Sequence, residues 1–175
     1  VQYNYMGKIA VTVAGNAYFG RLNTSVQARV RIDFPSSFPI YVEPVVTYSR
    51  WDYFRSSTLF FDLQKPAYFT QRDKDGHLNL GFPLGGKGKC VAAVGVAEIN
   101  NVYYQTENFT SVDTADRTDF NFAYGQLEYE MNSLNRKLYA SEGRYANVKA
   151  KYIQGLETQF PGTTTTDTLF KNFPH

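Results

Sequence analysis

Hydrophobic and polar residues alternate over most of this chain, and the alternation is clearest between Lys8 and Asp33. Apolar or small side chains take the odd positions from Ile9 to Phe19 and the even positions from Leu22 to Ile32. A period of two residues is typical of a β-strand whose two faces differ in chemistry. The change of parity predicts a hairpin that turns at Gly20-Arg21, because a type II′ turn needs glycine at its first central position.

A two-residue turn at this point fixes the register of the predicted hairpin. Phe19 then lies opposite Leu22, and Lys8 lies opposite Asp33, so that opposite charges face each other. A shift by one residue would move every apolar side chain to the other face. The hairpin is therefore expected to be long, with one apolar face and one polar face.

Further alternating segments predict a series of neighbouring strands. Together with residues 5–19 and 21–33 they are residues 40–50, 58–63, 77–84, 89–104, 118–131 and 144–156. Prolines interrupt the pattern between the second and third segments, and the polar stretch 65–76 reads as a turn. We therefore expect an all-β chain, an antiparallel up-and-down meander of about eight long strands over residues 1–158. Residues 159–175 are expected to form a Thr-rich loop or tail.

Three architectures fit such a meander: a soluble barrel around a small apolar ligand, a β-sandwich, and all or part of a transmembrane β-barrel. Membrane strands need about 9–11 residues, whereas strands of soluble sheets are mostly about 5–6 residues long. The opening hairpin has strands of the longer kind, so the pattern favours the membrane barrel. The soluble barrel remains the alternative.

In the membrane architecture the two faces of each strand meet different surroundings, because apolar side chains face lipid and polar ones face the lumen. The residues expected to face lipid are Ile9, Val11, Val13, Val26, Val30 and Ile32. The polar residues expected to face the lumen are Arg21, Arg29, Arg31, Lys149 and Lys151. Pairing of these cations with nearby carboxylates is favoured over a role in ion selectivity.

Composition narrows the function classes. The formal net charge is only +2, without a concentrated basic face, so nucleic acid is not an expected partner. Cys90 is the single cysteine, which excludes an internal disulfide. No Gly-x-Ser-x-Gly nucleophile motif occurs, and His77 is expected to be a lumen or surface residue rather than a catalytic base. Since no metal-ligand spacing is present either, we expect a chain that is not an enzyme and has no cofactor.

Several segments together carry a family resemblance. They are Asp33-Phe34-Pro35 with Pro39, Trp51-Asp52-Tyr53-Phe54, Phe60-Phe61, Pro66, Tyr103-Tyr104-Gln105, the loop from Phe109 to Asp116, and the turn from Asn132 to Lys137 with Gly143. The set resembles the C-terminal outer-membrane β-barrel of patatin-like phospholipases of Gram-negative bacteria. That barrel belongs with the bacterial surface-antigen and outer-membrane assembly-factor barrels.

The resemblance implies a transmembrane barrel of about sixteen strands, of which this chain would hold an inner half. Its function would be to anchor a patatin-like hydrolase of the parent chain in the bacterial outer membrane, or to help translocate it. The expected partners are outer-membrane lipid, that hydrolase domain, and further copies through open sheet edges. Asn135 and Ala140 depart from the family's usual Asp and Pro, and the Arg-Gly loop motif of the later strands is missing. The alternative function is that of a soluble module for a small apolar ligand.

Overall fold

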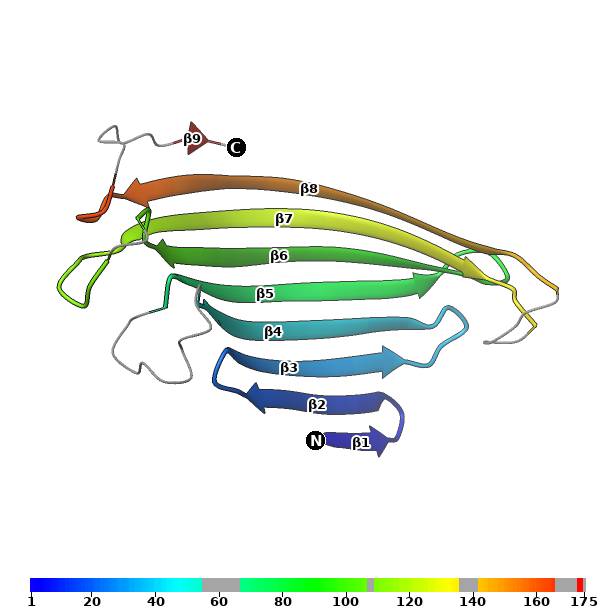
Figure 1. The fold of residues 1–175 in the computed structure, drawn as a ribbon. Coiled ribbons are helices and arrows are strands. Elements are labelled where there is room, and N and C mark those ends of the chain that lie inside the picture. The colour runs from blue at the N-terminus through cyan, green and yellow to red at the C-terminus, as the bar shows by residue number, and fades with distance from the viewer. Residues whose placement is uncertain (55–66, 107–108, 136–141, 166–172, 175) are drawn as a thin grey trace.

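The computed structural model describes residues 1–54, 67–106, 109–135, 142–165 and 173–174. These residues form one antiparallel sheet of nine strands whose spatial order is the sequence order (Figure 1). The strands are β1 (Gln2–Met6), β2 (Ala10–Phe19), β3 (Asn23–Phe34), β4 (Ile40–Tyr53), β5 (Phe69–Pro83), β6 (Gly88–Tyr103), β7 (Asp116–Asn132), β8 (Tyr145–Phe160) and β9 (Phe173–Pro174). The prediction of an all-β up-and-down meander is confirmed.

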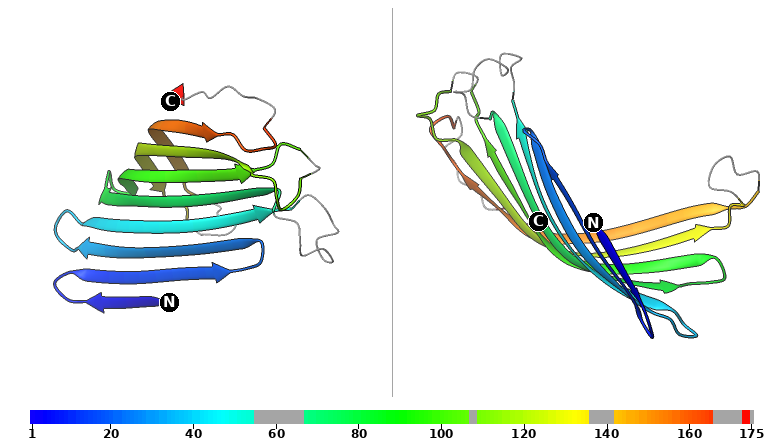
Figure 2. Two further views of the ribbon diagram at one scale, coloured as in Figure 1. Left: turned by 90° about the vertical axis from the view of Figure 1, so that its left-hand side faces the viewer. Right: turned by 90° about the horizontal axis from the view of Figure 1, so that it is seen from below.

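The sheet is open and curved. β1 forms one edge, and at the other edge β9 pairs with only two residues of β8. The views in Figure 2 show a single layer of strands that twists strongly, with β1 and β8 on its two sides. Twist of this kind is the normal result of right-handed strand geometry.

A single layer leaves most side chains without cover. The chain exposes 12484 Å², whereas a compact protein of this mass exposes about 8,700 Å². Among the described residues, the buried apolar side chains are Ala14, Val45, Cys90, Ala93, Tyr104 and Phe109. Main-chain pairing between strands, rather than a central core, therefore holds these residues together.

The four strands from β5 to β8 have 15 to 17 residues each. Strands in soluble sheets are usually about 5–6 residues long. The connections differ between the two ends of the sheet. At one end, here called the short-turn end, residues 7–9, 35–39, 84–87 and 133–144 join successive strands. At the other, the long-loop end, residues 20–22 join β2 to β3, residues 54–68 join β4 to β5 and residues 104–115 join β6 to β7.

The predicted first strand, residues 5–19, is in fact two strands. Residues 7–9 turn the chain, and the Gly7 N–H donates a hydrogen bond to the Ile9 carbonyl at 3.0 Å. β1 then pairs with β2, with Tyr5 opposite Val11. The alternation alone concealed this hairpin, because its two strands have the same apolar parity on either side of a three-residue turn.

The turn between β2 and β3 is longer than the predicted two residues. Phe19 pairs with Thr24 rather than Leu22, and the Gly20 N–H donates to the Asn23 carbonyl at 2.7 Å. Asp33 consequently lies opposite Ala10, and the predicted pair with Lys8 is wrong. The register differs by two residues, so every side chain keeps the face that was predicted for it.

The polar stretch 65–76 was predicted as a turn, and this is wrong for its described part. Residues 69–76 form the first half of β5, paired on both sides with β4 and β6. Asp73 and Asp75 lie within this strand, where neighbouring strands supply the hydrogen bonds that the residues alone do not favour. The predicted strand 58–63 lies outside the described residues.

Candidate functional site

The strand register divides the side chains into two faces, because directly opposed residues of antiparallel strands point to the same side. Val13 lies opposite Val30, Val42 opposite Leu80, and Ala92 opposite Leu127. Followed across β2 to β8, these pairs define an apolar face. Its middle section, the apolar band, contains Val11, Val13, Val26, Val30, Ile32, Ile40, Val42, Val46, Leu78, Leu80, Val94, Val96, Leu127 and Val148.

The apolar band has no second layer over it in the described part of the chain. Val46 and Val94 are each 63% exposed, and Val148 is 66% exposed. Scattered exposed apolar residues are ordinary, but a continuous band of this extent marks an interaction surface. The band is therefore the first candidate functional feature of the protein.

The opposite side, here called the polar face, carries a network of charged and amide side chains. Arg31 forms an ion pair with Asp33 at 2.7 Å, and the Asn79 amide donates to Glu43 at 3.2 Å. Lys89 on β6 lies 3.5 Å from Glu130 on β7. Of the cations predicted for this face, Arg31 has a carboxylate partner, whereas Arg29 and Lys149 have no ion pair among the described residues.

A compact cluster on the polar face is centred on Asp75. Its Oδ1 lies 2.5 Å from Nδ1 of His77, and its Oδ2 accepts a hydrogen bond from the Tyr124 hydroxyl at 2.8 Å. The Lys151 ammonium lies 3.9 Å from the centre of the Tyr124 ring. One carboxylate thus joins two strands that are not neighbours, across Gly95 of β6, and stiffens the centre of the sheet.

Glycines show how differently the two faces are filled. On the polar face, a Cβ added at Gly95 would lie 2.7 Å from the Tyr124 ring, and one at Gly155 would lie 2.5 Å from Cβ of Phe122. On the apolar face, a Cβ added at Gly76 or Gly125 would meet nothing within 4 Å. The polar face is the crowded one, where large rings lie over small residues, and the apolar face is open.

The strand register separates the two sets of residues that the sequence singled out. The apolar face carries Val11, Val13, Val26, Val30 and Ile32, and the polar face carries Arg29, Arg31, Lys149 and Lys151. Ile9 and Arg21 lie in turns rather than in strands. The structure places the strand residues of each set together, while the nature of the medium on either side stays a prediction.

A feature that sequence reasoning missed lies beyond the apolar band, on the same face and toward the long-loop end. There the side chains become charged or amide-bearing, and we call them the charged rim: Arg50, Asp52, Arg72, Lys74, Glu98, Asn100, Arg117, Asp119 and Asn121. Three ion pairs lie within it: Arg50 with Asp52 at 3.0 Å, Lys74 with Glu98 at 2.9 Å, and Arg117 with Asp119 at 2.6 Å. The charges at the alternate positions 72 and 74 indicate one face of a strand, but the polar residues of the stretch 65–76 predict a turn.

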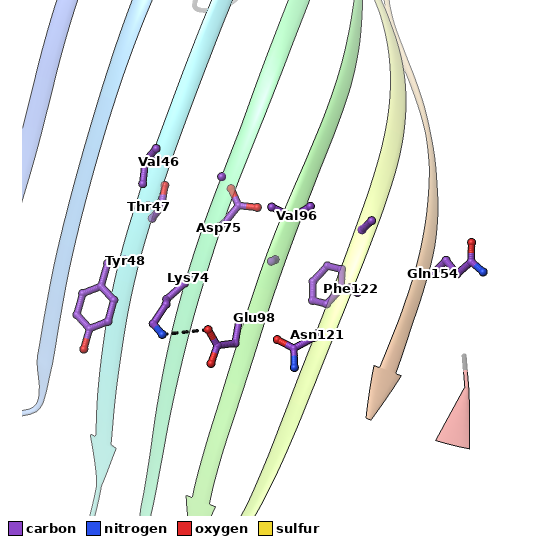
Figure 3. Close-up of a pocket in the computed structure, with 13 residues that line it drawn as sticks. Val46, Thr47, Tyr48, Lys74, Asp75, Val96, Glu98, Asn121, Phe122 and Gln154 are labelled. Carbon is purple, nitrogen blue, oxygen red and sulfur yellow. Dashed lines mark hydrogen bonds and ion pairs between the residues drawn. The ribbon is translucent and has the colours of Figure 1, made fainter. Parts of the chain in front are cut away.

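A hollow of about 700 Å³ lies where the apolar band meets the charged rim (Figure 3). Val46, Gly76, Val96 and Ala123 line its apolar side, and the Lys74–Glu98 ion pair borders it toward the rim. Gly76 and Ala123 leave room because they have little or no side chain. A second hollow of about 360 Å³ continues from it, and the two share Lys74 and Glu98.

At the long-loop end, the segment after β8 is fastened to the loop between β6 and β7. Asp116 is fully buried and accepts hydrogen bonds from the Gly162 N–H at 2.5 Å and from the Thr165 hydroxyl. The Thr163 hydroxyl donates to Asp113 at 3.2 Å. Hydrogen bonds from Thr110 lower the pKa of Asp113 below its ordinary value. These contacts hold two loops in one arrangement.

No candidate metal site is formed by the described residues. They contain no group of three or more His, Cys, Asp or Glu side chains that could hold a metal ion. Cys90 is buried on the apolar face, opposite Phe82 and Tyr129. The described residues form no helix that is long and apolar enough to cross a membrane.

Comparison of the chain with protein-family models, with curated proteins and with solved structures finds no match. The fold class rests on the strand topology alone, and the candidate site rests on the chemistry of the two faces.

Proposed function

We propose that this chain is a non-catalytic part of a transmembrane β-barrel of the bacterial outer membrane. In this proposal the apolar band faces lipid and the polar face lines the barrel interior. The observation that carries it is the separation of apolar from polar side chains between the two faces over the middle of a single-layer sheet, with the apolar band left uncovered among the described residues.

The height of the apolar band supports this assignment. On β4 the band with its bordering Tyr48 runs over eight residue steps from Ile40, or about 27 Å along the strand, which a barrel tilt of about 40° reduces to about 21 Å of height. The apolar belt of outer-membrane barrels is about 25 Å tall. Aromatic residues lie at both ends of the band, with Phe34 and Phe82 toward the short turns and Phe19 and Tyr48 toward the long loops. Girdles of this kind suit the two membrane interfaces.

Three of the four connections at the short-turn end have three to five residues, whereas two of the three at the long-loop end have 12 or more, and this difference supports an orientation. Outer-membrane barrels have short turns on the periplasmic side and longer loops outside. By this rule the turns 35–39 and 84–87 would lie in the periplasm, and the fastened loops near Asp116 would lie outside. The charged rim would then project above the membrane on the outer side.

The open edges of β1 and β8 support a place within a larger sheet, since unpaired strands expose a row of hydrogen-bonding groups. We propose that further strands complete the barrel, and that the barrel anchors or helps translocate a patatin-like hydrolase of the parent chain. This last step rests on the sequence resemblance alone. The second candidate, a soluble module for a small apolar ligand, is favoured by one observation, the hollow over Gly76.

Neighbouring residues on opposite faces of β4 provide the decisive test. Val46 lies on the apolar face and Thr47 on the polar face. A bimane label on Val46→Cys, made in a Cys90→Ser background and reconstituted with brominated phospholipid, should be strongly quenched. The same label on Thr47→Cys should be quenched much less, because brominated acyl chains reach only the lipid-facing side.

Equal quenching at the two positions would contradict the proposed sidedness. A protein that is monodisperse without detergent and shows no quenching at either position would instead establish the soluble module. Esterase activity that His77→Ala abolished would contradict the non-catalytic assignment.

A further inference from the structure

The charged rim carries more positive than negative side chains. Arg50, Lys74 and Arg117 each have a carboxylate partner, but Arg72 has no ion pair among the described residues. It is exposed on the apolar face, at the point where the band has given way to polar residues. Its guanidinium is therefore available to a ligand.

Arg50 and Arg72 also lie directly opposite each other on β4 and β5. Like charges at directly opposed positions of two strands destabilise their pairing. Asp52 offsets the charge of Arg50, so the uncompensated charge of this pair is that of Arg72. An anionic group beside Arg72 would offset it.

The hollow next to Arg72 is suited to such a group. Arg72, Lys74, Asn100 and Arg117 line a space of about 360 Å³, and Glu98 is the one carboxylate on it. Guanidinium groups bind phosphate oxygens through two parallel hydrogen bonds, and the Asn100 side chain borders the same space. The lining fits a phosphate group.

The larger hollow below extends this site toward the apolar band. It shares Lys74 and Glu98 with the upper space, and Val46, Val96 and Ala123 line it. A ligand that filled both would need an anionic head and an apolar body joined end to end. The Lys74–Glu98 ion pair at the border of the larger hollow is drawn in Figure 3, and the smaller hollow lies on the long-loop side of it, which matches a lipid whose head group points toward the long loops.

We propose that the charged rim and the hollow beneath it form a binding site for a lipid with an anionic, phosphate-bearing head group. This inference rests on the proposed function, because the apolar band must face the membrane for a lipid to reach the site. It goes beyond that function by assigning Arg72 and Arg117 to the phosphate, and the hollow over Gly76 to an acyl chain.

Native mass spectrometry of the protein in mixed micelles tests this site. The probes are phosphatidylglycerol, with an anionic phosphate head group, and zwitterionic phosphatidylcholine of the same acyl chains. We expect the wild-type protein to retain phosphatidylglycerol preferentially. Arg72→Gln should reduce this preference about tenfold, as expected for the loss of a hydrogen-bonded charge. Arg72→Lys should retain part of it.

Arg29→Gln is the matched control. Arg29 is exposed on the polar face and, like Arg72, has no ion pair among the described residues. Its substitution removes the same charge and should leave the lipid preference unchanged. Equal loss in the Arg29 and Arg72 variants would overturn the site, because it would show a non-specific effect of net charge.

Two further outcomes would also overturn the proposal. Retention of inorganic phosphate by the wild-type protein, together with no preference between the two lipids, would show that the rim binds the free anion rather than a lipid. Quenching of the Val46 label by brominated lipid, together with no preference for phosphatidylglycerol, would leave the membrane assignment intact and reject the head-group site. Absence of quenching at Val46 would reject both the membrane assignment and the head-group site.

Discussion

At the scale of single residues, the protein uses glycine to separate a crowded face from an open one. Gly95 and Gly125 lie one strand apart in the middle of the sheet, on β6 and β7. The first lies beneath the Tyr124 ring, and the second has nothing within 4 Å of an added Cβ. Glycine is required at position 95 because a ring lies over it, whereas position 125 has room for a side chain.

The pair gives a matched test of this difference. Gly95→Ala should lower the free energy of unfolding by about 1–3 kcal/mol, because the new methyl group overlaps Tyr124 and His77. Gly125→Ala should leave it unchanged or raise it by about 0.4–1 kcal/mol through the lower entropy of the unfolded chain. Urea titration of protein reconstituted in lipid vesicles, followed by the fluorescence of Trp51, measures both. The same loss in both variants would mean that the two faces are equally packed.

Asp113 makes the fastening of the two loops dependent on pH. The Thr110 N–H donates to its carboxylate at 2.8 Å, and this bond together with the Thr110 hydroxyl lowers the pKa of Asp113 below its ordinary value of 3.8. A carboxyl group whose pKa is lower in the folded state adds stability above the unfolded value, and loses it as the pH falls through the folded value. The contact with Thr163 should therefore hold at neutral pH and weaken below about pH 4.

Hydrogen exchange at the Thr163 amide, which donates to the Thr114 carbonyl at 2.9 Å, reports on this contact. Its protection, corrected for the intrinsic exchange rate, should fall on acidification in the wild-type protein. In Asp113→Asn the protection should be lower at neutral pH and should not depend on pH in this range. Protection that falls equally in both proteins would assign the effect to another group.

At the scale of strands, the β2–β3 hairpin shows what an alternating pattern determines. The pattern gives the face of each residue, because a strand has a strict period of two. It does not distinguish registers that differ by two residues, since these keep every side chain on the same side. The turn decides between them, and here Gly20 lies in a longer turn than its sequence suggested.

Disulfide cross-linking separates the two registers in a Cys90→Ser background. Val13→Cys with Val30→Cys joins residues that are directly opposed, and oxidation should link them efficiently. Val13→Cys with Ala28→Cys would be opposed only in the register of a two-residue turn, and it should link much more slowly. Intact-mass analysis after oxidation measures both yields. Faster linkage of the second pair would restore the shorter turn.

The first half of β5 shows where sequence patterns fail. Residues 69–76 are polar on both faces and contain Asp-Gly, which is typical of a turn. They form a strand because β4 and β6 pair with them on either side and because this part of the sheet extends beyond the apolar band. A strand that is polar on both faces shows no alternation of apolar and polar residues, so the sequence pattern does not predict it. The charged rim was missed for the same reason.

At the scale of the whole molecule, the open sheet predicts association. The outer edge of β8 is unpaired along most of its 16 residues in the described structure, and β1 exposes the opposite edge. Unpaired edges of this length favour pairing with another chain. Studied alone in detergent, the chain should form oligomers whose size increases with protein concentration. Sedimentation velocity at several concentrations checks this, and a compact closed monomer would contradict it.

How much of the molecule the sequence determines differs between its parts. The fold class and the faces of Val13 and Arg29 follow from local alternation, which neighbouring strands reinforce. The hollow over Gly76 and the facing of Arg50 by Arg72 arise from the register between adjacent strands. No local pattern encodes that register, so these features became apparent only in three dimensions.

The identity of spatial and sequence order also has a mechanical consequence. In the described structure the main chain of each strand from β2 to β8 pairs only with the strands before and after it, so the outermost pair can separate first. A force applied to the N-terminus would therefore separate the strands sequentially from the β1 edge, one strand at a time. Each step would release 10 to 17 residues for the strands from β2 to β8. Assembly could proceed by the reverse route, with each new strand added to an edge that the chain has just made.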